Sequence, residues 1–453
     1  MKTDITEERT EKMTIRPTLR LLQISGIALV LGAMIGCNTL SEATDPAGFA
    51  YHPAQPQRFE RVADVEVSSS DSLESVSAQH QGTIISWHPE DGYATLGFMA
   101  GNGLRLQSTS TNISAYKSPS AESASAAGLS SWSSGWKSWA GGWKSWAGGW
   151  KSWAGGDFSA TSDQNDEVWK KIKLPAATLL APKAGKDVIV AVIDTGIDVE
   201  HPAFKGSLTD SSTWWDWVGG DALPQEEAGG SSYGHGTCVA GIVLQIAPRA
   251  KIMPLRVLGK DGYGDTAHVI AAIGWAVSRG AKVINLSLGT TKDASLDKAL
   301  GNAASKGVLI VASSGNTGDQ NVTYPASSSM RLGTLGAMMV GVGSTGLSDQ
   351  KSKFSTYGLA VFDTTSIGEN ISSAVPEDRI GVWSGTSMAA PMISGAFALA
   401  LGERQFTDLK RLGLAIGNTN DNLMFSDSTY WIMLGGRLNL ERFLKTVFSP
   451  NYR

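Results

Sequence analysis

Between residues 188 and 342, short apolar runs alternate with longer stretches of helical character. The apolar runs cover residues 188–193, 251–258, 282–288, 307–312 and 337–342. The helical stretches cover residues 235–246, 265–279 and 294–306. Continuous apolar runs of strand length are typical of parallel strands buried on both faces by helices. We therefore predict an α/β protein with a doubly wound, mostly parallel central sheet.

Three polar residues stand where such a fold presents functional side chains. Asp194 follows the run 188–193, at the carboxyl end of a predicted strand. His235 lies between glycines at the start of one predicted helix, and Ser387 lies at the start of another made of small residues. Unpaired N–H groups at a helix N-terminus would stabilise an oxyanion formed beside Ser387. The simpler alternative for this serine is a helix cap.

Four motifs resemble the signature set of the subtilisin-like serine proteases. They are DTGID from Asp194, GHGTCVAG from Gly234, SSGN from Ser313 and SGTSMAAP from Ser384. The order Asp, His, Ser along the chain is also that of the family. The resemblance covers residues 163–448 and implies a subtilisin-like fold and a serine endopeptidase of the EC 3.4.21 type.

The resemblance also implies roles for single residues. Asp194 would orient the imidazole, His235 would act as general base and then as general acid, and Ser387 would attack the carbonyl carbon. Asn316 would complete the oxyanion hole with its side-chain amide.

Two short segments resemble the walls of the family's substrate pocket. These walls and the pocket floor would be formed by Ser287, Leu288, Gly289, Ser313, Ser314, Gly315 and Thr323. Main-chain groups along both walls would bind a polypeptide as an added strand. A threonine at the floor predicts a preference for mid-sized side chains before the cleaved bond.

We expect no required cofactor and no zinc site, because the sequence has neither a Cys-x-x-Cys nor a His-x-x-x-His pair. Calcium-binding relatives carry a longer loop before Ala247, and an aspartate where this chain has Ala203. Their calcium site is therefore expected to be absent. The carboxylates that could bind calcium elsewhere are expected to be solvated loop charges; they are Asp210, Asp221, Glu226 and Glu227.

The two cysteines suggest different roles. Cys238 shares a helical face with His235, and we expect a small buried side chain whose modification by mercury would inhibit the enzyme. Cys37 ends the apolar run of residues 21–35 in a sequence that resembles a bacterial lipobox. We expect residues 1–37 to be a signal sequence, with translation starting at Met1 or Met13, and Cys37 to carry a lipid anchor.

The segments between this signal and the protease region differ in composition. Residues 38–57 are expected to be a tether, and residues 58–110 a small β-rich or α+β unit with strands near 82–87 and 93–98. That unit is either a propeptide or a spacer. Residues 111–162 contain GWKSWAG repeats and are predicted to be a low-complexity linker; a tryptophan surface for lipid or envelope contact is the alternative. Residues 163–453 form the predicted catalytic domain.

Composition limits the partners of the chain. A net charge of -4 over 453 residues, without a Lys/Arg-rich block, gives no support for a nucleic-acid partner. We expect a monomer that acts on polypeptides and is exported, as a cell-envelope lipoprotein or an extracellular enzyme. The predicted function is a serine endopeptidase made as a precursor; one case left open is an enzyme that is latent until a second protease removes residues 58–156 from the cleft. The alternative is a catalytically silent envelope-binding lipoprotein.

Overall fold

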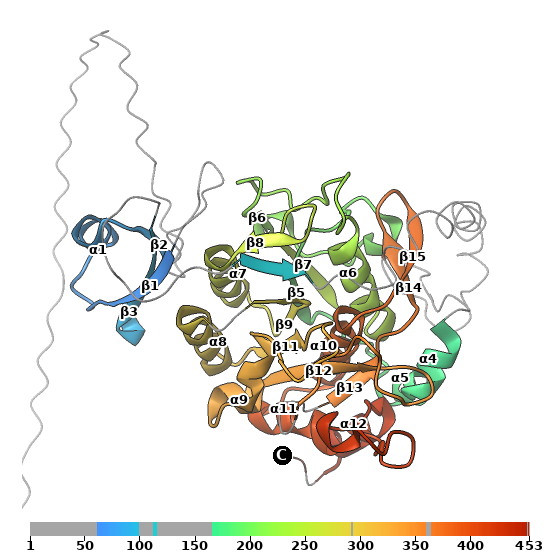
Figure 1. Ribbon diagram of the computed structural model, residues 1–453. Coiled ribbons are helices and arrows are strands. Elements are labelled where there is room, and N and C mark those ends of the chain that lie inside the picture. The colour runs from blue at the N-terminus through green and yellow to red at the C-terminus, as the bar shows by residue number, and fades with distance from the viewer. Residues whose placement is uncertain are drawn as a thin grey trace, which may run out of the picture. The chain divides into compact units, whose positions relative to one another are not determined.

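The computed structural model describes residues 61–98, 112–115, 165–290, 293–358, 364–450 and 452 (Figure 1). The predicted signal sequence, Cys37, the tether and the GWKSWAG repeats lie outside these residues. None of the helices within the described ranges has the length and apolar character needed to cross a membrane.

The predicted parallel sheet is confirmed, and seven strands form it within the described part of the chain. In spatial order they are β13 (Thr364–Ile367), β12 (Met339–Thr345), β11 (Leu309–Ser313), β9 (Val283–Leu286), β5 (Ile189–Asp194), β7 (Lys251–Arg256) and β6 (Trp215–Asp216). All neighbouring pairs run parallel. The strand order reverses at β5, because β7 pairs on one side of it and β9 on the other. The carboxyl ends of strands at such a reversal form the crevice where doubly wound sheets bind ligands.

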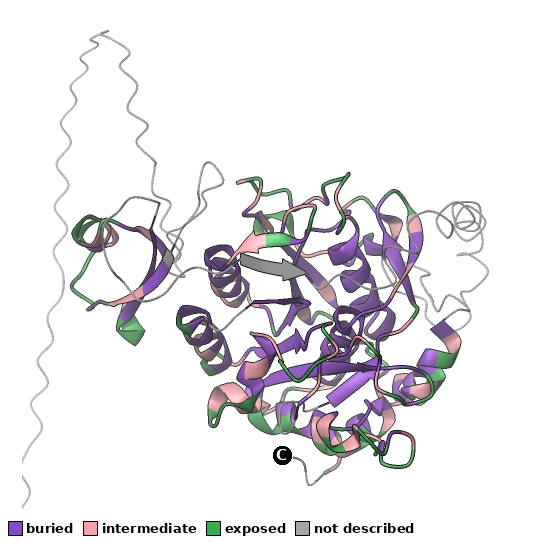
Figure 2. Ribbon diagram, viewed as in Figure 1, coloured by how far each residue is buried: buried purple, intermediate pink, exposed green. Residues whose placement is uncertain are grey.

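Helices cover both faces of this sheet (Figure 1). On one face α6 (His235–Ile246) packs against α10 (Thr386–Glu403), and on the other α7 (Thr266–Ser278) packs against α8 (Ala294–Ser305). Every residue of α6 is buried, and Figure 2 shows the strands behind it buried as well. A Cβ atom at Gly395 would lie 2.5 Å from the Cβ of Ile246, so this glycine permits the close approach of α10 to α6.

The remaining elements of the catalytic domain lie around this framework. They are α4 (Asp166–Lys171), α5 (Leu174–Leu180), α9 (Thr334–Met338), the hairpin of β14 (Ile371–Val375) and β15 (Arg379–Trp383), α11 (Leu409–Asn418) and α12 (Leu440–Val447). The hairpin packs against α6.

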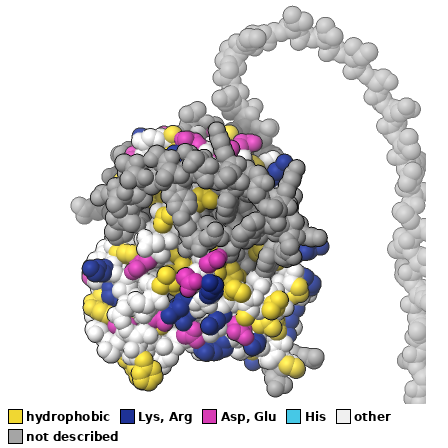
Figure 3. Space-filling model, turned by 90° about the vertical axis from the view of Figure 1, so that its right-hand side faces the viewer, with side chains coloured by type: hydrophobic (Ala, Val, Ile, Leu, Met, Phe, Trp, Pro, Cys, Tyr) yellow, Lys and Arg dark blue, Asp and Glu magenta, His cyan; other side chains and the backbone are white. Residues whose placement is uncertain are grey.

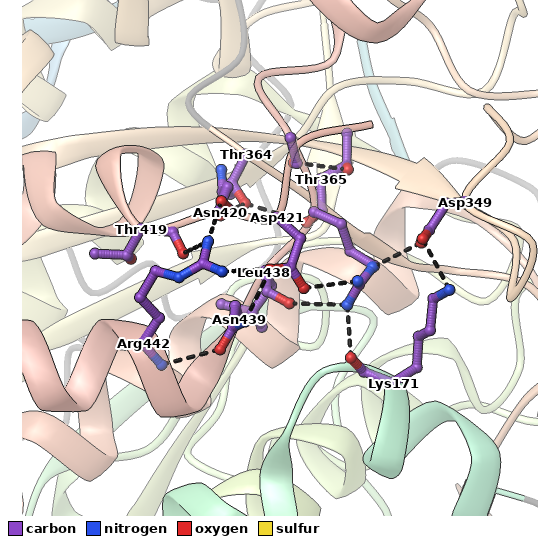
Figure 4. A network of polar contacts seen from close by, with 12 residues as sticks. Lys171, Asp349, Thr364, Thr365, Thr419, Asn420, Asp421, Leu438, Asn439 and Arg442 are labelled. Atoms are coloured by element: carbon purple, nitrogen blue, oxygen red, sulfur yellow. Dashed lines mark hydrogen bonds and ion pairs between the residues drawn. The ribbon is translucent and has the colours of Figure 1, made fainter. Parts of the chain in front are cut away.

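A buried arginine ties the end of the domain to its beginning (Figure 4). Arg437 donates hydrogen bonds to Asp349 Oδ1 and Asp421 Oδ2, each at 2.7 Å, and to the carbonyl oxygen of Lys171 at 2.6 Å. Lys171 Nζ lies 2.8 Å from Asp349 Oδ2, and Arg442 lies 3.0 Å from Asp421 Oδ1. These five residues are called the closing cluster below. They join α4, the loop after β12 and the segment before α12.

Residues 61–98 form a small α+β unit. Its antiparallel sheet has the order β1 (Arg61–Glu66), β3 (Tyr93–Phe98), β2 (Thr83–His88), and α1 (Leu73–His80) connects β1 to β2. The two strands expected near residues 82–87 and 93–98 are confirmed. Neither β1 nor α1 was predicted, because RVADVE mixes charged with apolar residues and α1 has few apolar positions.

This small unit contacts helix α8. Asn302 donates to His88 Nδ1 at 3.2 Å and to Tyr93 Oη at 3.1 Å. The Lys298 ammonium lies 3.8 Å from the centroid of the Tyr93 ring, a cation–π contact. Val62 of β1 is fully buried within the same core cluster as the main domain. Ile85 of β2 is buried in that cluster as well, so the unit is attached through both apolar and polar contacts.

Candidate active site

The carboxylate at the end of β5 is bonded to the histidine at the start of α6. Asp194 Oδ1 lies 2.7 Å from His235 Nδ1, and both side chains are buried. The carboxylate also accepts the Thr195 N–H at 2.7 Å, which fixes its orientation. Since Asp194 is an acceptor, the ring proton lies on Nδ1 and the lone pair on Nε2. Within the described part of the chain, Nε2 has no hydrogen-bond partner.

The surroundings of His235 favour its charged form. Burial opposes protonation, but the charge of Asp194, the hydrogen bond to it and the charge of Glu226 together raise the pKa of the ring. Trp383 lies edge-on to the ring, with centroids 5.9 Å apart. An imidazole held in this way accepts a proton more readily than histidine in water.

Ser387 is the second residue of α10, as the sequence predicted. Its hydroxyl donates to the carbonyl oxygen of Ser287 at 3.3 Å, at the end of β9. Pro391 follows inside the helix and has no N–H to donate to the Ser387 carbonyl. The Ser287 hydroxyl fills that role at 2.9 Å. Ser287 therefore anchors the beginning of α10 from two directions.

The orientation of the Asn316 amide follows from its acceptor contacts. Asn316 Oδ1 accepts the Thr386 N–H at 3.0 Å and the Thr386 hydroxyl at 2.9 Å. An N–H can only donate, so the oxygen must face Thr386, and the amide nitrogen is turned the other way. That nitrogen lies 3.2 Å from where a Cβ at Gly385 would be. The structure thus places an N–H donor beside the residues that precede Ser387.

The two predicted pocket walls lie at the ends of neighbouring strands. Leu288 and Gly289 form β10 (Leu288–Gly289), directly after β9, and Ser313 ends β11. Thr323 donates to the Ser314 carbonyl through its N–H at 3.3 Å and its hydroxyl at 3.2 Å. The predicted floor residue is therefore bonded to a predicted wall residue.

A strand from the N-terminal part of the chain pairs with one of these walls. In β4 (Asn112–Ala115), Ala115 pairs with Leu288 and Ser114 with Gly289, antiparallel. On its other side β4 pairs with β8 (Tyr263–Asp265). Sequence reasoning assigned these residues to the linker, because NISA is too short and too polar to predict a strand.

Glu226 corrects one expectation. Asp210, Asp221 and Glu227 are exposed, as expected of solvated loop charges, but Glu226 is only 6% exposed. It accepts hydrogen bonds from the segments that carry Asp194 and His235. Its partners are the hydroxyls of Thr195, which follows Asp194, and of Thr237, which lies two residues after His235. Sequence reasoning missed that these two hydroxyls call for a buried carboxylate as acceptor.

Two further expectations concern Cys238 and metal binding. Cys238 is fully buried, and burial raises the pKa of its thiol well above the ordinary range, so the thiol stays protonated. Among the described residues, one group of three side chains meets the spacing of a metal site, His88, Glu90 and Asp91, and it lies in the small N-terminal unit. Ala203 is buried.

Comparison with known proteins agrees with this geometry. The profile of the subtilase family matches residues 185–414. Thermitase of Thermoactinomyces vulgaris is 35% identical over 281 residues, which cover 60% of this chain and 92% of that protein. Subtilisin BL of Lederbergia lenta is 34% identical, covering 52% of this chain and 87% of its own length. The cell wall-associated protease of Bacillus subtilis is 34% identical, covering 55% of this chain and 28% of that protein. The chain belongs to the subtilase family of serine proteases.

Proposed function

We propose that this subtilase is an endopeptidase whose nucleophile is Ser387, whose general base is His235 and whose orienting carboxylate is Asp194. The observation that carries the proposal is the buried 2.7 Å contact between His235 Nδ1 and Asp194 Oδ1, which leaves Nε2 as the basic atom. Asp194 lies at the carboxyl end of β5, next to the reversal of strand order, and this position fits a substrate crevice.

Each proposed step moves one proton. The Ser387 oxygen attacks the carbonyl carbon of the substrate while its proton passes to His235 Nε2. The resulting oxyanion accepts hydrogen bonds from the Ser387 backbone N–H and from Asn316 Nδ2. His235 then gives the proton to the leaving amine, which leaves the acyl group on Ser387. A water molecule attacks this acyl group in the same way and releases the carboxylic acid. Asp194 stabilises the imidazolium throughout and remains ionised.

Substrate binding is proposed to use the backbone of β10. The pairing of β4 with Leu288 and Gly289 supports this, because an extended segment of polypeptide already fits there as an antiparallel strand. The other proposed wall is Ser313, Ser314 and Gly315, with Thr323 at the floor. Rates on substrates that vary at the position before the cleaved bond test the floor assignment. Mid-sized side chains are expected to react fastest, and a preference for Arg or Lys would refute it.

The small unit of residues 61–98 is proposed to be a propeptide that keeps the enzyme latent. Two observations support this: the unit contacts α8, and β4 occupies the strand position beside β10. The antiparallel register directs the carboxyl end of β4 toward Ser287, whose carbonyl accepts the Ser387 hydroxyl. Self-cleavage is therefore expected shortly after Ala115.

Intact mass before and after treatment with a fluorophosphonate tests the catalytic proposal. Wild-type protein should gain one adduct and Ser387→Ala none. Full-length protein without an adduct should gain one after limited proteolysis in the region that follows Ala115. A processed chain that never reacts would favour the silent binding protein. Sequencing the new N-terminus locates the cleavage, and a Ser387→Ala chain that is processed equally fast would refute self-cleavage.

Export and membrane attachment through Cys37 remain proposals that rest on the sequence. The name of one relative, a cell wall-associated protease, fits an enzyme of the cell envelope. Mass spectrometry of the Cys37 peptide tests the anchor, and an unmodified cysteine would refute it. Sedimentation with envelope fragments, with and without residues 131–156, tests whether the GWKSWAG repeats bind them.

On the described part of the face in Figure 3, acidic side chains lie among the basic ones, which offers no uniform charge to a polyanion.

A further inference from the structure

Glu226 is a buried carboxylate that the proposed reaction does not use. It lies in the loop before α6, and none of the described lysines and arginines forms an ion pair with it, whereas the neighbouring Glu227 pairs with Arg256. A buried charge without a cation has to be stabilised by hydrogen bonds. The number and direction of those bonds therefore show what the carboxylate holds in place.

Four donors converge on this carboxylate. Oε1 accepts from the Thr195 hydroxyl, the Thr237 hydroxyl and the Thr237 N–H, each at 3.1 Å. Oε2 accepts the Gly234 N–H at 3.2 Å. The Thr195 hydroxyl itself accepts the Gly236 N–H at 2.9 Å. The backbone amides of residues 234, 236 and 237, which surround His235, are thus all connected to one side chain.

The hydroxyl directions are fixed by their other partners. The Thr237 oxygen accepts the Asp198 N–H at 2.9 Å, and the Thr195 oxygen accepts the Gly236 N–H, so each has only its own proton to donate to Glu226. Four donors facing two oxygens favour the ionised form, because a carboxylate only accepts, whereas a protonated acid would need an acceptor for its own proton. The helix has no other side-chain cap, since Gly234 stands at its N-cap.

We propose that Glu226 is a positioning residue for His235: its carboxylate holds the first turn of α6 against the end of β5, and its charge stabilises the imidazolium formed during attack. This inference rests on the proposed catalytic roles of His235 and Asp194. The carboxylate acts through the backbone and through Thr195, which also donates its N–H to Asp194. Glu226 touches neither the substrate nor the reacting atoms.

Electrostatics supports the geometry. The pKa of Glu226 is raised to about 7; burial is the main cause and the charge of Asp194 adds to it, while the hydrogen bonds from Thr237, Gly234 and Thr195 oppose it. The charge of Glu226 in turn contributes to the raised pKa of His235. It also raises the pKa of the Cys238 thiol and of the Tyr233 hydroxyl.

The test compares processed Glu226→Gln with wild type over a range of pH. Glutamine keeps the shape but has no charge, and its NH₂ group meets the Gly234 N–H. We expect kcat/KM to fall by ~10- to 100-fold. Losses of this size follow when the groups that hydrogen-bond to and orient a metal-binding histidine are removed. We also expect the acid midpoint of the pH profile to move to lower pH, because His235 loses a stabilising charge. A fall in folded fraction alone would lower the amplitude without moving this midpoint.

The neighbouring Glu227 supplies the matched control. Its carboxylate is half exposed and pairs with Arg256 at 2.6 Å, so Glu227→Gln should keep the wild-type midpoint and nearly the wild-type rate. If Glu226→Gln does not fold, Glu226→Asp keeps the charge with a shorter reach and should retain the midpoint at a lower kcat. A wild-type rate and midpoint in either Glu226 variant would overturn the proposal, as would a lower rate of Glu226→Gln at an unmoved midpoint.

Fluorophosphonate labelling separates this inference from the proposed catalytic roles. If wild type does not react after processing, the catalytic roles fail. If wild type reacts and Glu226→Gln reacts at the same rate with the same pH dependence, only the positioning role fails. The expected result is that Glu226→Gln reacts, but more slowly than wild type.

Discussion

Two groups of carboxylates in this enzyme, one in the closing cluster and one at the candidate active site, are stabilised in different ways. In the closing cluster, Asp349 and Asp421 both bond to the guanidinium of Arg437, and further cations lie beside them. At the active site, Asp194 and Glu226 have no lysine or arginine among their described partners. They are held by N–H groups, hydroxyls and one imidazole.

The difference relates to what each cluster has to do. A permanent cation fixes the charge of the closing cluster, which joins segments more than two hundred residues apart. Under the proposed mechanism the imidazole gains and loses a proton in every turnover, so a fixed cation beside it would oppose the charged state. The cations of the closing cluster thus hold distant segments together, whereas carboxylates held by neutral donors allow the neighbouring imidazole to change its charge.

Ser387→Ala gives the largest expected effect and separates chemistry from stability. Removing the nucleophile of a triad of this kind lowers kcat on the order of 10⁶-fold, so activity on a peptide ester should fall to background. The urea midpoint should stay near that of wild type, because only one hydroxyl contact, to the Ser287 carbonyl, is lost. Ser278→Ala, at the end of α7, is the control and should keep full activity. Substantial turnover by Ser387→Ala would refute the nucleophile assignment.

Arg437→Met should have the opposite effect. It removes the cation that the buried Asp349 shares with the partly exposed Asp421, but Lys171 and Arg442 still lie beside them, so we expect a loss of about 1 to 3 kcal/mol of unfolding free energy. The measurement is urea unfolding in a Ser387→Ala background, where self-digestion is absent. Lys445→Met removes an exposed ion pair and should cost less than about 1 kcal/mol. Equal stabilities of the two variants would show that the closing cluster contributes nothing.

Asn316→Ala tests whether the active-site donors act on the transition state. Loss of one oxyanion donor lowers kcat by about 100- to 1000-fold, with KM little changed. Asn321→Ala is the control, because that amide bonds to Asp319 in an exposed loop. Unchanged turnover in Asn316→Ala would mean that the Asn316 amide has a structural role only and does not stabilise the oxyanion.

Sequence reasoning predicted the parts of the molecule where apolar residues are continuous. The predicted helix 235–246 matches α6 at both ends, and the strand before Asp194 is shifted by one residue in β5. Both segments are buried throughout their length or nearly so, and apolar continuity is the signal of burial. In contrast, β13 reads TTSI and is fully buried, so its polar composition concealed it.

Sequence reasoning could propose site residues that belong to a motif. It could not propose a residue whose contacts are made with segments far away along the chain. The motifs identified Asp194 and His235, and the structure brings them together. Glu226 belongs to no motif, and its partners lie 31 and 11 residues away along the chain. A glutamate in a loop gives no sign of burial until the strand and helix around it are placed.

The pH dependence of stability gives the smallest effect and the most direct comparison of the two clusters. The ordinary pKa of Glu226, 4.5, is raised to about 7 in the folded protein, chiefly by burial, so the folded state binds its proton more tightly than the unfolded state. This carboxyl therefore destabilises the fold when ionised, and its unfavourable contribution decreases as the pH falls from about 7 toward 4.5. In a Ser387→Ala background, the stability of the Glu226 protein relative to Glu226→Gln should rise by roughly 2–3 kcal/mol between pH 8 and pH 5. Glu227→Gln should show no such change relative to its parent. A difference between the Glu226 proteins that is independent of pH would mean that the carboxylate is fully stabilised by its four donors, and that the active-site cluster is as permanently charged as the closing cluster.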